Sequence, residues 1–137
     1  MKIEKNNYFI TDNTKKLDIE FVTNILQTTY WAKDRSKDTI KKAIEHSINF
    51  SMFKETKQIG FARVVTDFTT FGYLADVIID EQYRNQGLGK WLIETIISDE
   101  RWKNLSLILA TKDAHKLYEK YGFENTTRLM KKSRKTN

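Results

Sequence analysis

The stretch Arg84-Asn85-Gln86-Gly87-Leu88-Gly89-Lys90 carries the strongest signal in this sequence. It holds two of the chain's five glycines and lies between an apolar run and a segment with helical spacing. Glycine lets the backbone approach a ligand closely. The unpaired N–H groups of a helix's first turn point outward, and the helix dipole adds partial positive charge there. This combination is typical of a phosphate-binding turn at the start of a helix.

Two common phosphate-binding motifs do not match this stretch. A dinucleotide-binding fingerprint requires a third glycine at the position where Leu92 stands. A Walker A loop requires a serine or threonine after its lysine, but Trp91 follows Lys90. From spacing alone, a tight turn with Arg84 as a surface charge explains the stretch as well as a ligand site does.

The segments around the stretch predict the fold. An apolar run over 71–80 precedes it, an amphipathic pattern over 88–100 follows it, and a second apolar run covers 105–110. Strand, helix and strand in this order form a βαβ crossover, which makes the two strands parallel. The earlier segments predict an antiparallel meander, so the expected fold class is α/β, a mixed sheet covered by helices. We expect further strands over 8–11, 49–54, 58–66 and 123–132. We also expect three further helices: one over 15–28, a second that follows an N-cap at Ser36, and a third over 112–121 with its N-cap at Thr111.

The composition is that of one globular domain over residues 1–137, with 39% hydrophobic and 31% charged residues. The absence of cysteine excludes disulfides and thiolate nucleophiles, and two histidines cannot form a three-histidine metal site, so we expect no metal. No apolar run approaches the roughly 18 residues of a membrane span, and the N-terminus lacks a signal-peptide core. We therefore expect a cytoplasmic protein that does not contact membranes.

Positive charge is concentrated at the C-terminus. The net charge is +6, and five basic residues follow the last acidic residue, Glu124, so the rest of the chain carries +1. A nucleic-acid-binding domain usually has a basic face. Binding of nucleic acid through the tail over 128–137 is therefore a less favoured alternative, and we expect this tail to be a solvated, frayed terminus.

Two motifs resemble those of the GCN5-related N-acetyltransferases, the GNAT family. The Arg-x-x-Gly-x-Gly pattern over 84–89 resembles the family's acetyl-CoA-binding motif, and residues 77–83 resemble the usual run into it, with Glu81 in place of a frequent proline. Residues 114–123 resemble a second family element at the usual distance downstream. The resemblance covers most of the chain. It implies a GNAT-like fold and transfer of an acetyl group from acetyl-CoA to a primary amine.

The resemblance implies a role for each motif residue. The backbone before the turn pairs with the pantetheine arm, the amides of the turn hold the pyrophosphate, and Tyr118 is the general acid. Thr111 stands near a common family asparagine, and either its hydroxyl contacts the cofactor or it only caps the next helix, which is the favoured role. The cofactor-binding candidates are Val77, Ile78, Ile79, Arg84, Asn85, Gln86, Gly87, Leu88, Gly89, Lys90 and Thr111.

The chemistry of acetyl transfer supports an acid role for Tyr118. A tyrosine titrates near pH ~10 and a thiol near ~8.5, so the phenol is protonated when a thiolate leaves. Because cysteine is absent, direct transfer is favoured over a cysteinyl intermediate. From helical spacing alone, packing explains Tyr118 better. The resemblance shifts the balance to the acid role.

The general base is less clear from the sequence. Some family members carry a glutamate where Tyr73 stands. Asp76 is a catalytic candidate, because it lies between apolar neighbours and a buried carboxylate has a raised pKa. A hydrogen-bonded structural carboxylate, for instance at a bulge, explains Asp76 equally well, and a water chain needs no fixed base. Strict alternation along 71–80 predicts Asp76 on the same face as Leu74 and Ile78, opposite Ile79.

The loop over 30–35 is expected to border the acceptor pocket, as in the family. The rings of Tyr30 and Trp31 could stack on an amine, and the nearby Asp34 carboxylate could attract its positive charge. An equally acceptable interpretation is that Trp31 is a core residue at the end of a helix. The substrate-binding candidates are Tyr30, Trp31, Asp34 and Tyr73. The sequence leaves open the acceptor and whether the protein is a monomer or a homodimer. The main alternative function is a non-catalytic CoA-binding regulator on the same fold.

Overall fold

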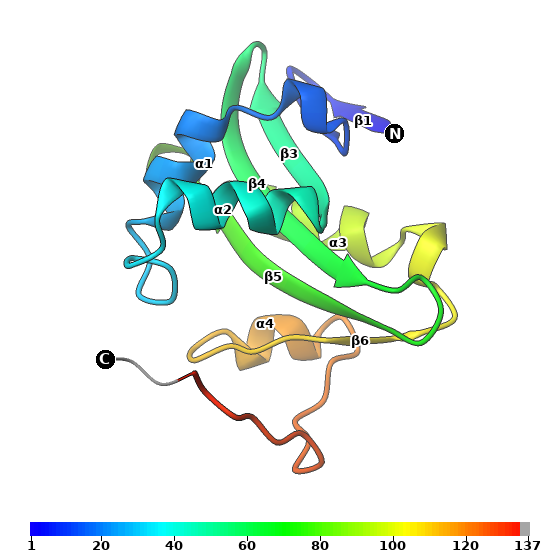
Figure 1. The fold of residues 1–137 in the computed structure, drawn as a ribbon. Coiled ribbons are helices and arrows are strands. Elements are labelled where there is room, and N and C mark those ends of the chain that lie inside the picture. The colour runs from blue at the N-terminus through cyan, green and yellow to red at the C-terminus, as the bar shows by residue number, and fades with distance from the viewer. Residues whose placement is uncertain (135–137) are drawn as a thin grey trace.

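A six-stranded mixed sheet runs through the protein (Figure 1). The structure, a computed structural model, describes residues 1–134. Strand order follows the sequence, with antiparallel pairing from β1 to β5 and parallel pairing of β5 with β6. The strands are β1 (Lys2–Lys5), β2 (Tyr8–Thr11), β3 (Ile48–Lys54), β4 (Lys57–Thr66), β5 (Phe71–Ile79) and β6 (Ser106–Ile108), and the α-helices are α1 (Ile19–Leu26), α2 (Lys37–Glu45), α3 (Leu88–Ile97) and α4 (His115–Glu119). The expected mixed α/β fold with its parallel crossover is confirmed.

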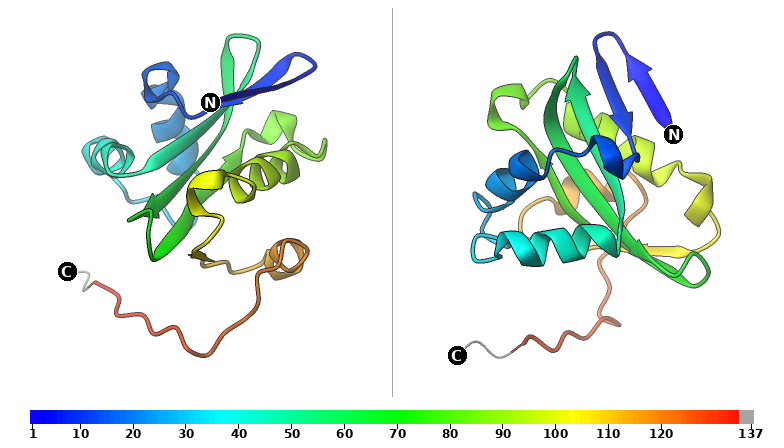
Figure 2. Two further views of the ribbon diagram at one scale, coloured as in Figure 1. Left: turned by 90° about the vertical axis from the view of Figure 1, so that its right-hand side faces the viewer. Right: turned by 45° about the horizontal axis from the view of Figure 1, so that its top comes forward.

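Helices cover both faces of the sheet (Figure 2). α1 and α2 lie on one face, whereas α3 and α4 lie on the other. Two apolar clusters fill the two interfaces. The smaller cluster joins α1 and α2 to the sheet through Val22, Leu26, Ile40, Ile44 and Phe61. The larger one lies between the sheet and α3. Because β3 and β4 are covered on both sides, they appear in the sequence as nearly continuous apolar runs.

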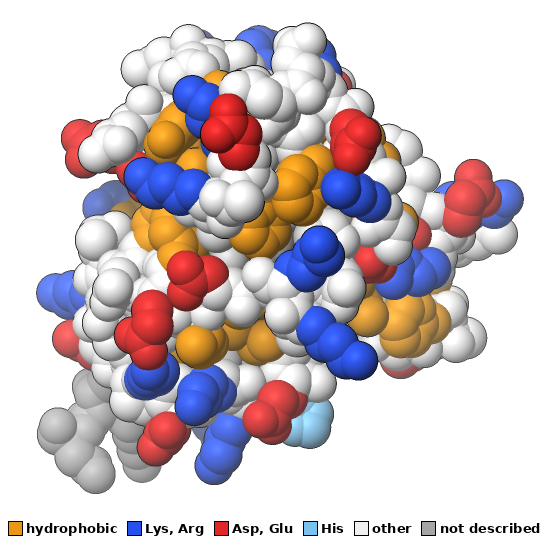
Figure 3. Space-filling view, turned by 90° about the horizontal axis from the view of Figure 1, so that it is seen from above, with side chains coloured by type: hydrophobic (Ala, Val, Ile, Leu, Met, Phe, Trp, Pro, Cys, Tyr) orange, Lys and Arg blue, Asp and Glu red, His pale blue; other side chains and the backbone are white. Residues whose placement is uncertain are grey.

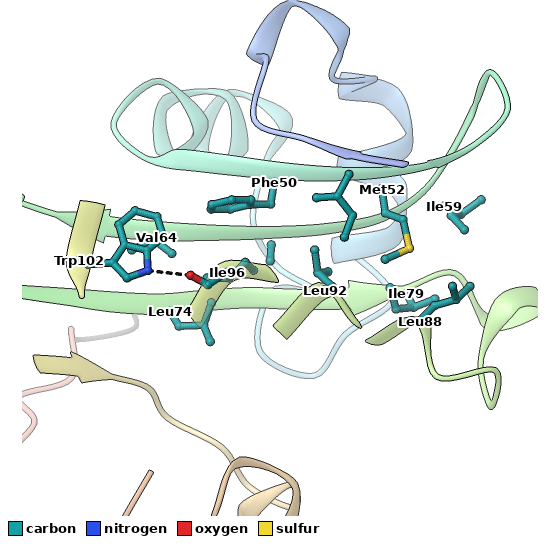
Figure 4. Packing of buried hydrophobic residues seen from close by; sticks show 12 residues of the cluster. Phe50, Met52, Ile59, Val64, Leu74, Ile79, Leu88, Leu92, Ile96 and Trp102 are labelled. Carbon is teal, nitrogen blue, oxygen red and sulfur yellow. Dashed lines mark hydrogen bonds between the residues drawn. The ribbon is translucent and has the colours of Figure 1, made fainter. Parts of the chain in front are cut away.

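The larger cluster fixes α3 against the sheet (Figure 4). Leu92 and Ile96 are fully buried, and the indole Nε1 of Trp102 donates a hydrogen bond to the Ile96 carbonyl over 2.8 Å. Leu88, the first residue of α3, packs in the same cluster as Ile79, the last residue of β5. This packing fixes the start of α3 beside the end of β5.

Two predictions for the N-terminal third are wrong. β1 has no counterpart in the sequence analysis, because all four of its residues are exposed and show no apolar alternation. The helix expected over 15–28 is divided into a 3₁₀ turn, η1 (Thr14–Lys16), and α1. α1 begins late because the Asp18 carboxylate accepts hydrogen bonds from the N–H groups of Glu20 and Phe21 and acts as its N-cap.

The C-terminal part also departs from the prediction. The strands expected over 123–132 do not form within the described residues, which carry no strand after β6. Leu129 and Met130 are 57% and 93% exposed there, because no other segment covers them. β6, α3 and α4 are each shorter than expected. Of the expected tail, residues 128–134 are exposed, and residues 135–137 lie outside the described residues.

A bulge interrupts β5 in its middle. Between Ala75 and Ile78, the two residues Asp76 and Val77 lie opposite the single residue Ala62 of β4. Asp76 has a φ of 56°, in the left-handed region. An extra residue of this kind bends a strand and redirects its side chains.

The bulge makes the expected strict alternation along β5 wrong. Leu74 and Ile79, expected on opposite faces, both pack in the larger cluster under α3. Ile78, expected to share a face with Leu74, packs instead in the smaller cluster under α1 and α2. Backbone irregularity at one residue therefore changes the face of every residue that follows it.

Candidate active site

β5 and β6 separate after a short stretch of pairing. They pair only from Phe71 opposite Ser106 to Tyr73 opposite Ile108, whereas β5 continues to Ile79. The rest of β5 has no strand partner on that side among residues 1–134. A strand edge with unpaired backbone groups can pair with an extended ligand.

The backbone of Ile79 faces this open edge. The N–H of Asp80 donates to the Ile59 carbonyl on β4 over 2.7 Å, and backbone groups point alternately to the two edges of an antiparallel strand. On the open side, Arg84 Nε donates to the Ile79 carbonyl over 2.9 Å. Arg84 therefore fastens the turn before α3 to the end of β5.

The start of α3 is uncapped and exposed. Its N-cap, Gly87, has a φ of 78°, and Asn85 has a φ of 65°. The helix has no side-chain cap and no acidic residue in its first turn. Among residues 1–134, no hydrogen bond uses the N–H groups of Leu88, Gly89 or Lys90. These amides and the helix dipole therefore present uncompensated partial positive charge to solvent.

A cavity of about 540 Å³ lies where β5 and β6 separate. It is bordered by the middle of β5, by residues 109–114 after β6, by the loop over 30–35 and by α4. The sequence candidates that it brings together are Tyr30, Trp31, Tyr73, Asp76, Val77, Thr111 and Tyr118. A second hollow of about 660 Å³, beside Met1 and the last turns of α3, contains none of the candidates.

Asp76 lies in a network of three donors. Arg63 Nε and Arg35 Nη1 both donate to its Oδ2, over 2.7 and 2.8 Å, and Trp31 Nε1 donates to its Oδ1 over 3.0 Å. The Asp76 side chain is only 2% exposed, and those of Arg63 and Arg35 are 12% and 28% exposed. A buried carboxylate with these partners anchors the loop over 30–35 to the sheet.

The aromatic pair at the cavity is not accompanied by Asp34. Tyr30 and Trp31 meet edge to face with ring centroids 5.1 Å apart. Asp34 is exposed and does not line the cavity, so the carboxylate beside the pair is Asp76. Lys112 Nζ lies 5.3 Å from the centre of the Tyr30 ring, and both residues line the cavity.

Tyr118 enters the cavity from α4. It is half-buried and packs edge to face on Phe123, with ring centroids 5.7 Å apart. Burial raises the pKa of Tyr118 above its ordinary value, so the phenol keeps its proton at neutral pH. The N-cap expected at Thr111 is wrong, because α4 begins at His115 with Ala114 as its N-cap and has no side-chain cap. Thr111 Oγ1 accepts a hydrogen bond from the Ala114 N–H over 3.0 Å, within the turn before α4, and Thr111 lines the cavity.

Sequence reasoning missed the two arginines as site residues. Arg63 lies among buried apolar residues of β4, and a charge in such a run requires a partner of opposite sign. That signal points to Asp76, the acidic residue within the apolar run of β5. Arg35 carries no comparable signal, because it lies in an irregular polar loop.

The surface seen in Figure 3 carries both signs of charge. Lysine and arginine side chains are interspersed there with aspartate and glutamate, as expected for a body with little net charge. Over residues 1–134, no helix reaches the length and hydropathy needed to cross a membrane, and no three side chains from His, Cys, Asp and Glu converge as metal ligands.

Comparison with known proteins identifies the family. A sequence profile of the acetyltransferase (GNAT) domain matches residues 45–125, more than half of the chain. The chain belongs to the GNAT family of acetyltransferases. It is 30% identical over 129 residues to the uncharacterized N-acetyltransferase ycf52 of Porphyra purpurea, covering 89% of this chain and 73% of that protein.

Solved structures of GNAT proteins have the same fold. A GNAT-family protein from Xanthomonas campestris pv. campestris superposes with a TM-score of 0.88 at 35% identity, covering 92% of each chain. A GNAT acetyltransferase from Elizabethkingia anophelis, whose crystal structure contains acetyl-CoA, superposes with a TM-score of 0.69 at 23% identity, covering 89% of this chain and 79% of that one. At 23% identity, the similarity to the Elizabethkingia anophelis protein shows a shared fold only.

Proposed function

We propose that this GNAT protein transfers the acetyl group of acetyl-CoA directly to a primary amine. The observation that carries the proposal is the uncapped start of α3 beside the open edge of β5. Unpaired amides at a helix N-terminus suit a diphosphate, and an open strand edge suits an extended amide-containing arm. The cavity at the far end of that edge leaves room for an acceptor.

The residues that would hold the donor follow from this arrangement. The amides from Asn85 to Lys90 would bind its diphosphate, and the backbone of Val77 and Ile79 would pair with the pantetheine arm. Asn85 and Gly87 both occupy the left-handed region, a conformation that helps a turn to gather successive N–H groups around an anion. When bound, the donor supplies an acetyl thioester at the cavity that Tyr118 lines.

The proposed reaction is one displacement with balanced proton transfers. The neutral amine nitrogen attacks the thioester carbonyl carbon, a C–N bond forms, and the C–S bond breaks. The nitrogen releases its proton to water, and Tyr118 Oη gives its proton to the departing sulfur. Solvent then returns a proton to the tyrosine. No covalent enzyme intermediate is needed, in agreement with the absence of cysteine.

We assign Asp76 a positioning role in this reaction. Its two oxygens already accept three hydrogen bonds from Arg35, Arg63 and Trp31. These contacts hold the loop over 30–35 as one wall of the cavity. We leave proton removal from the amine to water, because Asp113, the other acidic residue that lines the cavity, is exposed in the segment after β6.

Substituting Gly89 with aspartate tests the diphosphate site. Aspartate in the first turn suits the helix dipole, so the melting temperature should hold or rise. The same charge repels a diphosphate, so the Kd for acetyl-CoA measured by calorimetry should increase by about 10-fold or more. The site has space for a side chain, since a Cβ at Gly89 meets only Ile79 Cγ1, at 3.7 Å.

The matched control is Gly89→Asn, which has nearly the same shape without the charge. Its Kd should lie much closer to that of the unmodified protein. Equal Kd values for Gly89→Asp and Gly89→Asn would contradict the diphosphate assignment, because the added charge would then have no effect of its own.

A further inference from the structure

The charged residues that line the cavity are mainly basic. Four basic residues, Arg35, Arg63, Lys112 and Lys131, line it together with two acidic ones, Asp76 and Asp113. Asp76 is already paired with both arginines. The charge that remains for a ligand is therefore positive. Such a cavity disfavours polycationic acceptors and attracts an anionic group.

Arg35 has donors to spare. A guanidinium carries five N–H donors in a planar fork. Of the three guanidinium nitrogens of Arg35, only Nη1 takes part in a hydrogen bond within residues 1–134, the one to Asp76. Its side chain is 28% exposed at the cavity, whereas Arg63 is 12% exposed and gives a second donor to Ser47. Nε and Nη2 of Arg35 are free to form a bidentate contact with a carboxylate.

The position of Arg35 is fixed before any ligand binds. Its N–H donates to the Ala32 carbonyl over 3.0 Å, and its own carbonyl accepts from Gln27 Nε2 over 2.9 Å. Asp76 holds the other end of the side chain from within the sheet. A donor that is already ordered loses little side-chain entropy on binding.

We propose that the acceptor is an amino carboxylate, a molecule of the amino-acid class, whose carboxylate binds Arg35. This inference rests on the proposed function and specifies the substrate class of that same site. The positive surroundings also favour the neutral form of the amino group, which is the form that attacks the thioester. Tyr30 and Trp31, which line the same cavity, suit an apolar or aromatic side chain on the acceptor.

The test compares each amino acid with the amine that lacks only its carboxylate. L-Phenylalanine is paired with 2-phenylethylamine and L-leucine with 3-methylbutylamine, and spermidine represents the polycations. Release of free CoA thiol is followed at several pH values, and kcat/KM is calculated from the concentration of the acceptor whose amino group is neutral at each pH. We expect each amino acid to exceed its partner by about 10-fold or more, and spermidine to be the poorest substrate.

Arg35 variants link this preference to one side chain. Arg35→Gln should bring the ratio of kcat/KM for the amino acid to kcat/KM for its paired amine close to one, because KM for the amino acid should rise more than KM for the amine. Arg35→Lys keeps the charge but not the fork, so it should retain an intermediate preference. Lys33→Gln removes a positive charge from the same loop outside the cavity and should retain the full preference.

The outcomes separate this inference from the proposed function. If the protein binds acetyl-CoA but acetylates the amines as well as the amino acids, or acetylates none of the panel, the amino-carboxylate assignment is wrong and the donor site stands. If acetyl-CoA does not bind, the proposed function itself fails. A preference that survives in Arg35→Gln overturns the role of Arg35.

Discussion

Replacing Tyr118 with phenylalanine should lower kcat by about 100-fold or more, because the departing thiolate loses its proton donor. The free energy of unfolding should change by less than about 1 kcal/mol. The ring keeps its edge-to-face contact with Phe123, and the Tyr118 hydroxyl has no hydrogen-bond partner to lose among residues 1–134. Steady-state kinetics with saturating acetyl-CoA, together with urea denaturation, measure both quantities.

The matched control is Tyr121→Phe on the same segment. The Tyr121 hydroxyl donates to Glu94 Oε1 over 3.0 Å at the exposed side, and Tyr121 does not line the cavity where β5 and β6 separate. Its kcat should stay within about twofold. Equal losses in the two variants, or full activity in Tyr118→Phe, would show that Tyr118 is a packing residue.

The pH profile gives a second signature of Tyr118. Burial raises its pKa, so the acid form persists on the alkaline side beyond the ordinary value of about 10. Activity of the unmodified protein should therefore decline only above that pH, as the phenol loses its proton. This alkaline decline should be absent from the residual activity of Tyr118→Phe.

Substituting Asp76 with asparagine should destabilise the protein by about 3–5 kcal/mol, as expected when one member of a buried ion-pair network is removed. Asparagine adopts the left-handed backbone of this position readily, so the loss reports the charge and not strain. Its amide NH₂ cannot accept from Arg35 or Arg63, which leaves guanidinium donors buried without an anion. Denaturant titration followed by tryptophan fluorescence measures the loss.

Asp34→Asn is the control for Asp76→Asn. Asp34 is exposed in the same loop region and outside the cavity, so its substitution should change the free energy of unfolding by less than about 0.5 kcal/mol. A loss below about 1 kcal/mol in Asp76→Asn would mean that the network adds little to stability. It would also return Asp76 to the list of possible bases.

The sequence was most informative where local patterns carry the fold. The crossover of β5, α3 and β6 follows from apolar runs and helical spacing, and Gly87 and Gly89 mark the turn between them. β1 escaped prediction because an exposed edge strand needs no apolar face. The strands expected over 123–132 did not form in the described residues, since propensity alone does not create a pairing partner.

The site was predictable only as far as its parts are local. The glycine-containing turn that leads into α3 could be located from the sequence, and its role in binding a diphosphate stays a prediction. The donors of the Asp76 network come from positions 13, 41 and 45 residues away along the chain, so no local pattern contains them. The bulge at Asp76, which turns its carboxylate toward them, depends on the pairing of β5 with β4 and not on the sequence of β5 alone.

The most direct test of the proposed donor site is a titration of the ¹⁵N-labelled protein with acetyl-CoA, followed by amide chemical shifts. We expect saturable shifts at sub-millimolar ligand concentration, largest at Gly87, Leu88, Gly89 and Lys90 and extending along the open edge to Val77 and Ile79. Amides at the start of α3 that stay unchanged at millimolar acetyl-CoA would contradict the donor site and the acetyl transfer that depends on it.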